Sequence, residues 1–311
     1  METTARIYLD FVLQYPRIHI YDNLLGWKLK KSIIIRRKTR QFDYSTSTNS
    51  HGLRSDEIPL EKSHHVYRIL ILGDSMAFGE GVELEERFDQ QLKKLAIAGK
   101  TIEVINAGVM GYGTDQEFLY LASQGLKFKP DLVILMTHEN DIEDIMLDYN
   151  NTRRKPRFII KDGDLNITGL PIPFTSKIRD YSLVYTFFYT GLMKVIYRKP
   201  MLDLEDGLRL FLKLREKIYI LCQRNNINLV NVIFSSLKSL EERNTIWKRP
   251  ILESSSSQSV STIDLDPLFL DQENIKSLFL NQNIHWNREG SRIVGEFLLE
   301  KVTEILRDQV H

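Results

Sequence analysis

Four residues of the types that serve acyl transfer stand far apart along the chain. Ser75 follows Gly73-Asp74 at the end of an apolar run, and His285 stands near the C-terminus. Between them lie Gly111, in a glycine-rich stretch, and Asn140, in THENDIED. A serine can be a nucleophile, a histidine a base, and glycine N–H and asparagine amide groups can donate to an oxyanion. Taken singly, each has a structural alternative: a turn, a flexible loop, a helix cap or a structural histidine.

An alternating pattern of strands and helices must position these residues. Short apolar runs predict buried parallel strands at 66–74, 101–108, 131–137 and 227–236. Helical spacing of apolar residues predicts helices at 83–97, 114–126, about 204–224 and about 288–306. Such alternation predicts an α/β fold, with a mostly parallel sheet between helices. The carboxyl ends of its strands meet at one edge, where Ser75, Gly111 and Asn140 are expected.

The same residues resemble the motifs of the SGNH, or GDSL-like, hydrolases. GDS at 73–75 matches the family's nucleophile block, and NAGVMG ending at Gly111 matches its glycine block. Asn140-Asp141 matches the third block, and HWNREG at 285–290 matches the histidine block. The blocks occur in the family's order. The resemblance implies a three-layer α/β/α fold with a parallel, flavodoxin-like sheet.

The resemblance also implies a role for each candidate residue. Ser75 is the expected nucleophile, and its backbone N–H also serves the oxyanion hole. Gly111 is expected to donate its backbone N–H to that hole, and Asn140 its side-chain amide. His285 is expected to take the proton of Ser75 and to pass it to the leaving alcohol. These roles imply a serine ester hydrolase that works through an acyl-enzyme.

Two positions depart from the family pattern. His138 occupies the position, two residues before Asn140, where the family usually has glycine. The family's acid usually lies three residues before the histidine, where this chain has the uncharged Gln282, followed by Asn283. A carboxylate at that position orients the imidazole and stabilises the imidazolium, so its loss can cost several powers of ten in rate.

Three explanations remain open for this neutral position. In the first, Gln282 or Asn283 orients His285, as an amide does in Cys-His-Asn sites, in a weak or acetyl-specialised enzyme. In the second, a carboxylate from elsewhere reaches His285, and the candidates are Asp264, Asp266, Asp271 and Glu273. In the third, the chain is a catalytically silent carbohydrate-binding protein with a decayed site. The presence of the other four site residues favours an enzyme.

Small O-acyl esters, above all acetyl esters and those of carbohydrates, are the expected substrates. A carbohydrate ester is expected only because the chain resembles bacterial members of the family that have a small β-rich N-terminal segment. The residues that carry this resemblance are GW at 26–27 and TNSHGLR at 48–54. The same chemistry can transfer the acyl group to a sugar hydroxyl instead of water. An O-acyltransferase is therefore an alternative.

The composition argues against several other classes of protein. Lys plus Arg is 42 against 41 for Asp plus Glu, and nucleic-acid binding needs a clustered basic excess. The single cysteine, Cys222, excludes an intramolecular disulfide and a cysteine-based zinc cluster. The glycine spacing fits no dinucleotide or phosphate-loop motif, so we expect neither cofactor nor metal.

The location of the protein is predicted from two further features. No stretch approaches the ~18 apolar residues of a membrane span, and the N-terminus lacks the pattern of a signal peptide. We therefore expect a cytoplasmic protein. A periplasmic or membrane-anchored protein is the alternative, if an N-terminal anchor has been removed.

Some segments fall outside the alternating pattern. Residues 1–62 are expected to form a β-rich N-terminal extension, and residues 63–311 the SGNH-like domain. Within that domain, Asp162-Gly163 between two β-like runs predicts an inserted hairpin at about 150–176. The aromatic segment 181–193 is expected to be a packed core helix, with a lid over an acyl chain as the alternative.

Overall fold

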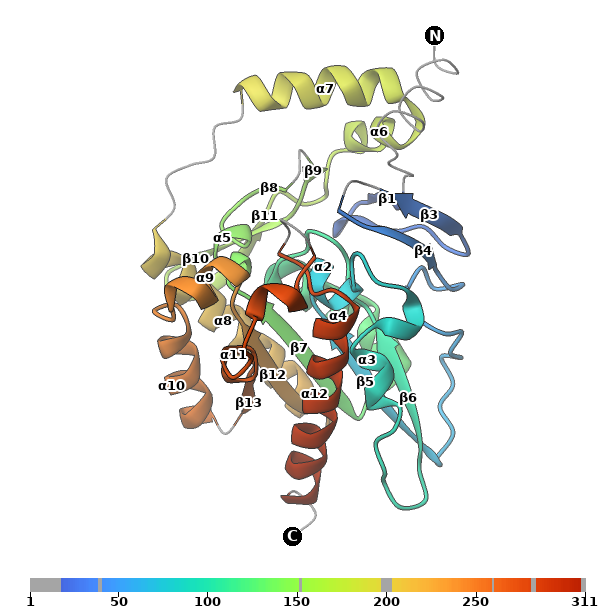
Figure 1. Cartoon of the computed structure of the whole chain (residues 1–311). Helices are drawn as coiled ribbons and strands as arrows, with labels where there is room; N and C mark the ends of the chain where they lie inside the picture. Colours follow the sequence, from blue (N-terminus) through green and yellow to red (C-terminus); the bar gives the residue numbers. More distant parts are fainter. Residues whose placement is uncertain are drawn as a thin grey trace.

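One parallel β-sheet organises the molecule. The structure, a computed structural model, describes residues 18–38, 41–150, 153–196, 203–258, 260–280 and 284–308. The sheet has five strands in the order β13-β12-β7-β5-β6 (Figure 1). Their bounds are β5 (Val66–Leu72), β6 (Thr101–Asn106), β7 (Leu132–His138), β12 (Asn228–Phe234) and β13 (Ser261–Asp264). Counted along the chain from β5, this is the 2-1-3-4-5 order of flavodoxin-like sheets, which confirms the predicted fold class.

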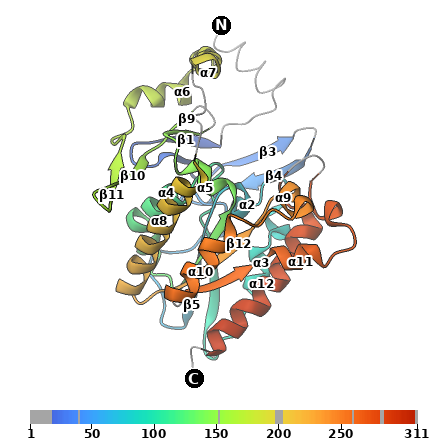
Figure 2. The ribbon, with the colours of Figure 1, turned by 90° about the vertical axis from the view of Figure 1, so that its left-hand side faces the viewer.

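Helices cover both faces of the sheet, because alternate residues of its strands point to opposite sides and both sets are apolar. Ile69 and Ile71 of β5 belong to an apolar cluster that includes residues of α12. Leu70 and Leu72 belong to a second cluster, on the other face, with residues of α4 and α8. The covering helices are α3 (Asp89–Leu92), α4 (Thr114–Ser123), α8 (Leu204–Arg224) and α12 (Arg288–Asp308). Figure 2 shows the sheet between these two layers.

The pairing register brings three loops to the same edge of the sheet. Ile71 of β5 is paired with Asn106, the last residue of β6, and Leu72 is paired with Leu135 of β7. All three strands are parallel, so the chain leaves each of them at the same end. The loops and helices that follow them therefore start side by side.

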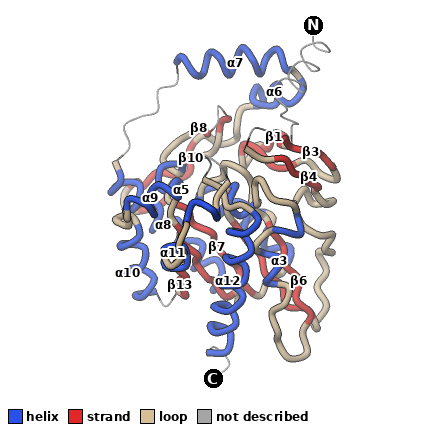
Figure 3. Tube along the Cα trace, viewed as in Figure 1, coloured by secondary structure: helices blue, strands red, loops and turns tan. Residues whose placement is uncertain are grey.

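Further helices complete the α/β body, as the tube in Figure 3 shows. They are α2 (Ser75–Phe78), η1 (Leu84–Glu86), η2 (Gly125–Phe128), α5 (Asn140–Asp144), α9 (Leu237–Glu242), α10 (Lys248–Gln258), α11 (Asp266–Leu270) and η4 (Ile275–Leu278). In the part of the chain that the structure describes, no helix is both long and apolar enough to cross a membrane.

Two small hairpins precede the sheet and lie over the end where α2 begins (Figure 1). They are formed by β1 (His19–Asp22) with β2 (Gly26–Leu29), and by β3 (Ile34–Lys38) with β4 (Asp43–Ser47). Trp27 and Tyr44 belong to the same apolar cluster as Leu70 and Leu72 of the sheet. The β-rich extension is thus present and packs into the core of the α/β body, while its boundary as a separate domain stays a prediction.

A second group of elements is inserted between β7 and α8. It comprises β8 (Tyr149–Asn150), β9 (Arg153–Arg154), β10 (Arg157–Lys161), β11 (Asp164–Thr168), η3 (Phe174–Lys177), α6 (Ile178–Tyr181) and α7 (Leu183–Ile196). The predicted hairpin is β10–β11, and Asp162 and Gly163 form its turn with φ values of 53° and 84°. Positive φ at both turn residues matches the twist of the strands.

The aromatic helix α7 is not buried in the core, so the expectation of a packed core helix is wrong. Phe187 and Phe188 are 65% and 69% exposed. Tyr185 and Tyr189, on the other side of the helix, are half-buried and stack with their ring centroids 5.5 Å apart. Apolar composition alone does not decide burial, because burial also needs a neighbouring surface to cover the helix.

Candidate active site

The candidate nucleophile opens a short helix directly after β5. Ser75 is the first residue of α2, and Asp74 caps this helix by accepting a hydrogen bond from the N–H of Met76 at 2.8 Å. At Gly73, an added Cβ would lie 2.6 Å from the Cβ of Ala77, so the tight turn from strand to helix needs glycine there. First-turn N–H groups have no partner within a helix, so the N–H of Ser75 can serve a ligand.

The fold brings the serine and the histidine into contact across 210 positions of the chain. Nε2 of His285 lies 2.7 Å from Oγ of Ser75. The segment before α12 holds the histidine, because the N–H of Leu280 donates to the carbonyl of His285 at 2.9 Å. The adjacent Trp286 is 4% exposed and packs against aromatic rings of the core. The structure therefore presents a hydroxyl and an imidazole at the distance that proton transfer requires.

The surroundings of His285 keep its imidazole neutral. Burial lowers the pKa of His285 from 6.5 to about 4, and the charge of Asp74 opposes this effect. A hollow beside the pair is lined by Ser75, Met76, Gly79, Glu80, Val82, His285, Trp286 and Ser291. At neutral pH the imidazole is thus a proton acceptor next to a small solvent-accessible space.

Glu80 is a carboxylate of the site that the sequence reasoning missed. Its Oε2 lies 3.9 Å from Nε2 of His285, and its Oε1 lies 3.0 Å from Nη1 of Arg37 on β3. Burial raises the pKa of Glu80, while the charge of Arg37 lowers it. A glutamate five residues after a serine matches no known motif. The contact becomes visible only in the folded loop, which brings Glu80 close to His285.

Two side chains fix the peptides on either side of Gly111, which has a φ of 77°. Nε1 of Trp27 donates to the carbonyl of Met110 at 3.1 Å, and Nδ2 of Asn150 donates to the carbonyl of Gly111 at 3.0 Å. A trans peptide is planar, with its N–H opposite its carbonyl. The bond from Trp27 therefore also sets the direction of the Gly111 N–H. Neither Trp27 nor Asn150 was singled out as a site residue from the sequence.

Asn140 begins α5, at the end of β7, and its side chain is bound by neighbouring carboxylates. Its Nδ2 lies 3.3 Å from Oδ2 of Asp74 and 3.1 Å from Oδ2 of Asp144, while its Oδ1 contacts Nδ1 of His138. The bulky His138 is buried against Phe234, with ring centroids 5.2 Å apart. Donation from Asn140 to an oxyanion would thus require an N–H to be shared with one of these carboxylates.

A group of buried carboxyls lies behind Asn140. Asp115 forms an ion pair of 2.6 Å with Lys155, and both side chains are fully buried. Burial and neighbouring carboxylates raise the pKa of Glu117 and of Asp141 well above their ordinary values. Burial also raises the pKa of Asp144 to about 6. Burial and the mutual repulsion of these carboxyls thus favour the neutral forms of Glu117 and Asp141.

The structure describes four of the six residues that were predicted as candidates to orient His285. Gln282 and Asn283 lie outside the described residues. Asp266 accepts hydrogen bonds from Ser235, at 2.8 Å from its N–H and 2.7 Å from its hydroxyl. Lys248 forms ion pairs with both Asp264 and Asp266. The two remaining candidates, Asp271 and Glu273, are exposed. The group that orients His285 therefore stays a prediction.

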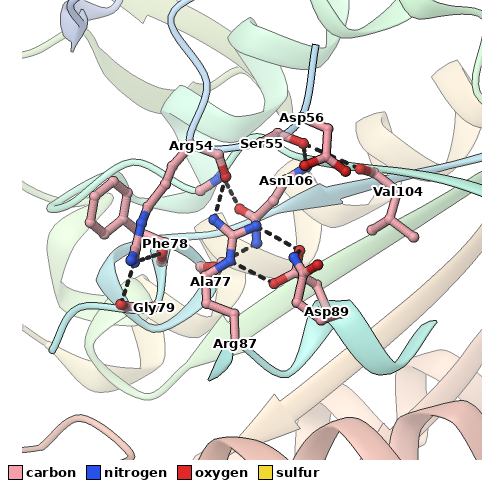
Figure 4. A network of polar contacts seen from close by, with 12 residues as sticks. Arg54, Ser55, Asp56, Ala77, Phe78, Gly79, Arg87, Asp89, Val104 and Asn106 are labelled. Carbon is pink, nitrogen blue, oxygen red and sulfur yellow. Dashed lines mark hydrogen bonds and ion pairs between the residues drawn. The ribbon is translucent and has the colours of Figure 1, made fainter. Parts of the chain in front are cut away.

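A buried polar network supports the helix that bears the serine (Figure 4). Arg54, which is fully buried, donates to the carbonyls of Phe78 at 3.0 Å and of Gly79 at 2.6 Å. These carbonyls lie at the carboxyl end of α2, where a cation is favoured. Arg87 forms a two-bond ion pair with Asp89 and donates to the carbonyl of Arg54. The arginine of the TNSHGLR stretch thus ties the extension to the helix that begins with Ser75.

The structure offers no candidate for a metal site among the residues it describes. In that part of the chain, no group of three or more His, Cys, Asp or Glu side chains is arranged to hold a metal ion.

Comparisons with known proteins find likeness in structure only. No protein-family model matches the chain, and no curated protein is significantly similar to it. A lipase/acylhydrolase from Enterococcus faecalis is 14% identical over 76% of this chain and 96% of that one, with a TM-score of 0.45. The psychrotrophic esterase EstA from a Pseudoalteromonas species is 14% identical over 77% and 98%, with a TM-score of 0.46. An acetyl xylan esterase is 16% identical over 76% and 98%, with a TM-score of 0.45.

Proposed function

We propose that this chain is a serine ester hydrolase of the SGNH type that works through an acyl-enzyme. Its proposed substrates are small O-acyl esters, above all acetyl esters, including those of carbohydrates. The distance of 2.7 Å between Oγ of Ser75 and Nε2 of His285 is the observation on which the proposal rests. The parallel sheet supports this proposal, because ligands of such sheets bind beyond the carboxyl ends of the strands and Ser75 follows that end of β5.

The proposed reaction begins with attack of Oγ of Ser75 on the ester carbonyl carbon. His285 accepts the hydroxyl proton at Nε2, and the carbonyl oxygen becomes an oxyanion. The N–H groups of Ser75 and Gly111 are the proposed donors to that oxyanion, with Asn140 as the third. When the tetrahedral intermediate collapses, the bond to the alcohol breaks and His285 returns the proton to it. Water then attacks the acyl-serine by the same route.

The neutral residues before His285 predict a modest rate. A base with a pKa of about 4 accepts a proton weakly, and no ionised triad acid is expected at Gln282. Asp74 raises the pKa of His285, and Glu80 lies 3.9 Å from its Nε2. These carboxylates would stabilise the imidazolium that forms in the reaction, and Gln282 or Asn283 would orient the ring.

Hydrolysis of p-nitrophenyl acetate by the wild type, Ser75→Ala and Gln282→Asp tests this proposal. We expect Ser75→Ala to lose at least about a hundredfold in kcat/KM, because the nucleophile is gone. We expect Gln282→Asp to gain, because a carboxylate would stabilise the imidazolium. Folding of each variant is checked by circular dichroism, so that a loss of activity is not a loss of structure.

Other outcomes of this assay would point to the alternatives. A fall in the activity of Gln282→Asp, beside a robust wild type, would indicate that another group orients His285. Absence of serine-dependent turnover in all folded chains would favour a silent carbohydrate-binding protein. An acetylated sugar formed when a sugar acceptor is added would favour an O-acyltransferase.

A further inference from the structure

The segment η3–α7 exposes large apolar side chains to solvent. They are Phe174, Ile178, Tyr181, Phe187, Phe188 and Leu192. Phe188 and Leu192 are one helical turn apart and Phe187 is adjacent, so these three lie on the outer side of α7. The other side of the helix contacts the protein, because the guanidinium carbon of Arg179 lies 5.5 Å from the ring centroid of Tyr189. A cluster of exposed apolar side chains marks a surface that binds a protein or a membrane.

Basic residues are concentrated in the parts of the chain around this surface. The two N-terminal hairpins (19–47) and the insertion (149–196) together contain 15 Lys and Arg against 5 Asp and Glu. The rest of the chain contains 27 against 36, so a strong asymmetry underlies the nearly neutral total. Figures 1 and 2 show the hairpins and the insertion at one end of the molecule, which we call the basic end.

Positive charge and apolar surface meet on the segment itself. Nζ of Lys177 lies 5.0 Å from the ring centroid of Phe174 and 5.9 Å from that of Tyr181. Residues 181–196, which include α7, contain neither Asp nor Glu. Aromatic and aliphatic side chains combined with Lys and Arg are typical of helices that lie in the interface of an anionic membrane.

We propose that the outer side of α7 docks on the surface of an anionic lipid membrane. The rings of Phe187 and Phe188 enter the headgroup region, and the basic end faces the lipid phosphates. Pairing of two copies of the chain through this surface is disfavoured, because each copy brings the same positive charge. The aliphatic Ile178 and Leu192 favour lipid over a single-stranded nucleic acid, whose bases stack on aromatic rings.

Docking by α7 would also orient the candidate active site. The hairpins of the basic end lie over the end of the sheet where α2 begins, and Ser75 is the first residue of α2 (Figure 1). That end of the sheet would therefore face the membrane. Lipid binding does not require ester hydrolysis, so the two can be measured separately.

Co-sedimentation of the intact chain with lipid vesicles tests the proposal. In about 0.1 M salt, we expect binding to vesicles of equal parts phosphatidylglycerol and phosphatidylcholine to be at least about tenfold tighter than binding to phosphatidylcholine alone, because only the mixed vesicles are anionic. Raising the salt to about 0.5 M should weaken this binding at least about tenfold, because salt screens the attraction.

The double variant Phe187→Ala, Phe188→Ala tests the role of the apolar side chains. We expect it to bind the mixed vesicles at least about tenfold more weakly, because the surface that enters the interface is lost. The matched control is Ile246→Ala, Leu270→Ala, since both side chains are exposed and apolar and belong to the α/β body. This control should bind as the wild type does. Circular dichroism checks that both double variants are folded.

Tryptophan fluorescence gives a direct readout of insertion. The emission of Phe188→Trp, after subtraction of the wild-type signal, should shift to shorter wavelength when mixed vesicles are added, because the indole leaves water. The emission of Ile246→Trp should not shift. Equal shifts in the two variants, or no shift in either, would contradict docking by α7.

Three other results would overturn the proposal. They are equal binding to the two kinds of vesicle, equal weakening by the two double variants, and binding of a single-stranded oligonucleotide in the absence of vesicle binding. Ser75→Ala should bind vesicles as the wild type does, because docking requires no turnover. If vesicles bind while no ester is hydrolysed, the proposed function fails and the membrane surface stands.

Discussion

His285 must be neutral to accept the proton of Ser75, so its pKa sets the acid limit of the proposed reaction. Burial lowers that pKa to about 4. We therefore expect kcat/KM for p-nitrophenyl acetate to rise with pH through about 4 and to be level above about 5. Initial rates at constant ionic strength, corrected for inactivation in acid, measure this profile. A midpoint near the ordinary histidine value of about 6.5 would contradict the desolvated imidazole.

The lowered pKa of His285 also makes the folded chain less stable in acid. The unfolded chain binds the proton of this histidine at a higher pH than the folded chain does. The contribution of neutral His285 to stability is thus complete above about pH 6.5 and declines as the pH falls toward 4. Activity and stability therefore change over different pH ranges, which allows the two effects to be separated.

Among the elements, β2 has a direct effect on the proposed oxyanion hole. Trp27→Phe keeps an aromatic ring in the core but removes the N–H that donates to the carbonyl of Met110. We expect kcat to fall roughly three- to tenfold with little change in KM, because the N–H of Gly111 is less well directed in the transition state. Steady-state kinetics with p-nitrophenyl acetate measures both parameters. A rise in KM at constant kcat would contradict a positioning role.

The end of helix α2 is stabilised by Arg54, an arginine that precedes the first strand of the parallel sheet. Arg54→Met removes the donor to the carbonyls of Phe78, Gly79 and Val82. We expect the free energy of unfolding to fall by about 3 kcal/mol or more, because buried carbonyls lose their partner. Urea unfolding followed by circular dichroism measures it. Arg209→Met, on the exposed side of α8, is the control and should change stability by less than about 0.5 kcal/mol.

The apolar core of the molecule lies on the two faces of the sheet, and the outward-facing side chains of α7 lie outside it. Phe211 of α8 is fully buried, whereas Phe187 and Phe188 are exposed. We expect Phe211→Ala to lower the free energy of unfolding by about 3–5 kcal/mol. The double change of Phe187 and Phe188 to alanine should cost less than about 1 kcal/mol. A large loss in the double variant, measured by urea unfolding, would show that these rings are covered.

The local pattern of the sequence determined the architecture well. The strands β5, β6, β7 and β12 and the helices α4, α8 and α12 were all predicted, because buried strands and amphipathic helices leave clear periodicities. The turn at Asp162-Gly163 was predicted as well, since its residues favour positive φ. Ser75, Gly111, Asn140 and His285 were recognisable as candidates because each follows or precedes such an element.

The side chains that meet in the site come from distant parts of the chain, and the fold brings them together. It brings His285 to Ser75, places Glu80 beside them, and reveals Trp27 and Arg54 as supports from the extension. These contacts join residues distant in the chain, and no local spacing encodes them. Burial is also a tertiary property: it lowers the pKa of His285, while α7, as apolar as a core helix, stays exposed. Local periodicity thus sets the elements and the chemical groups, whereas packing sets the distances between those groups, their charges and their exposure to water.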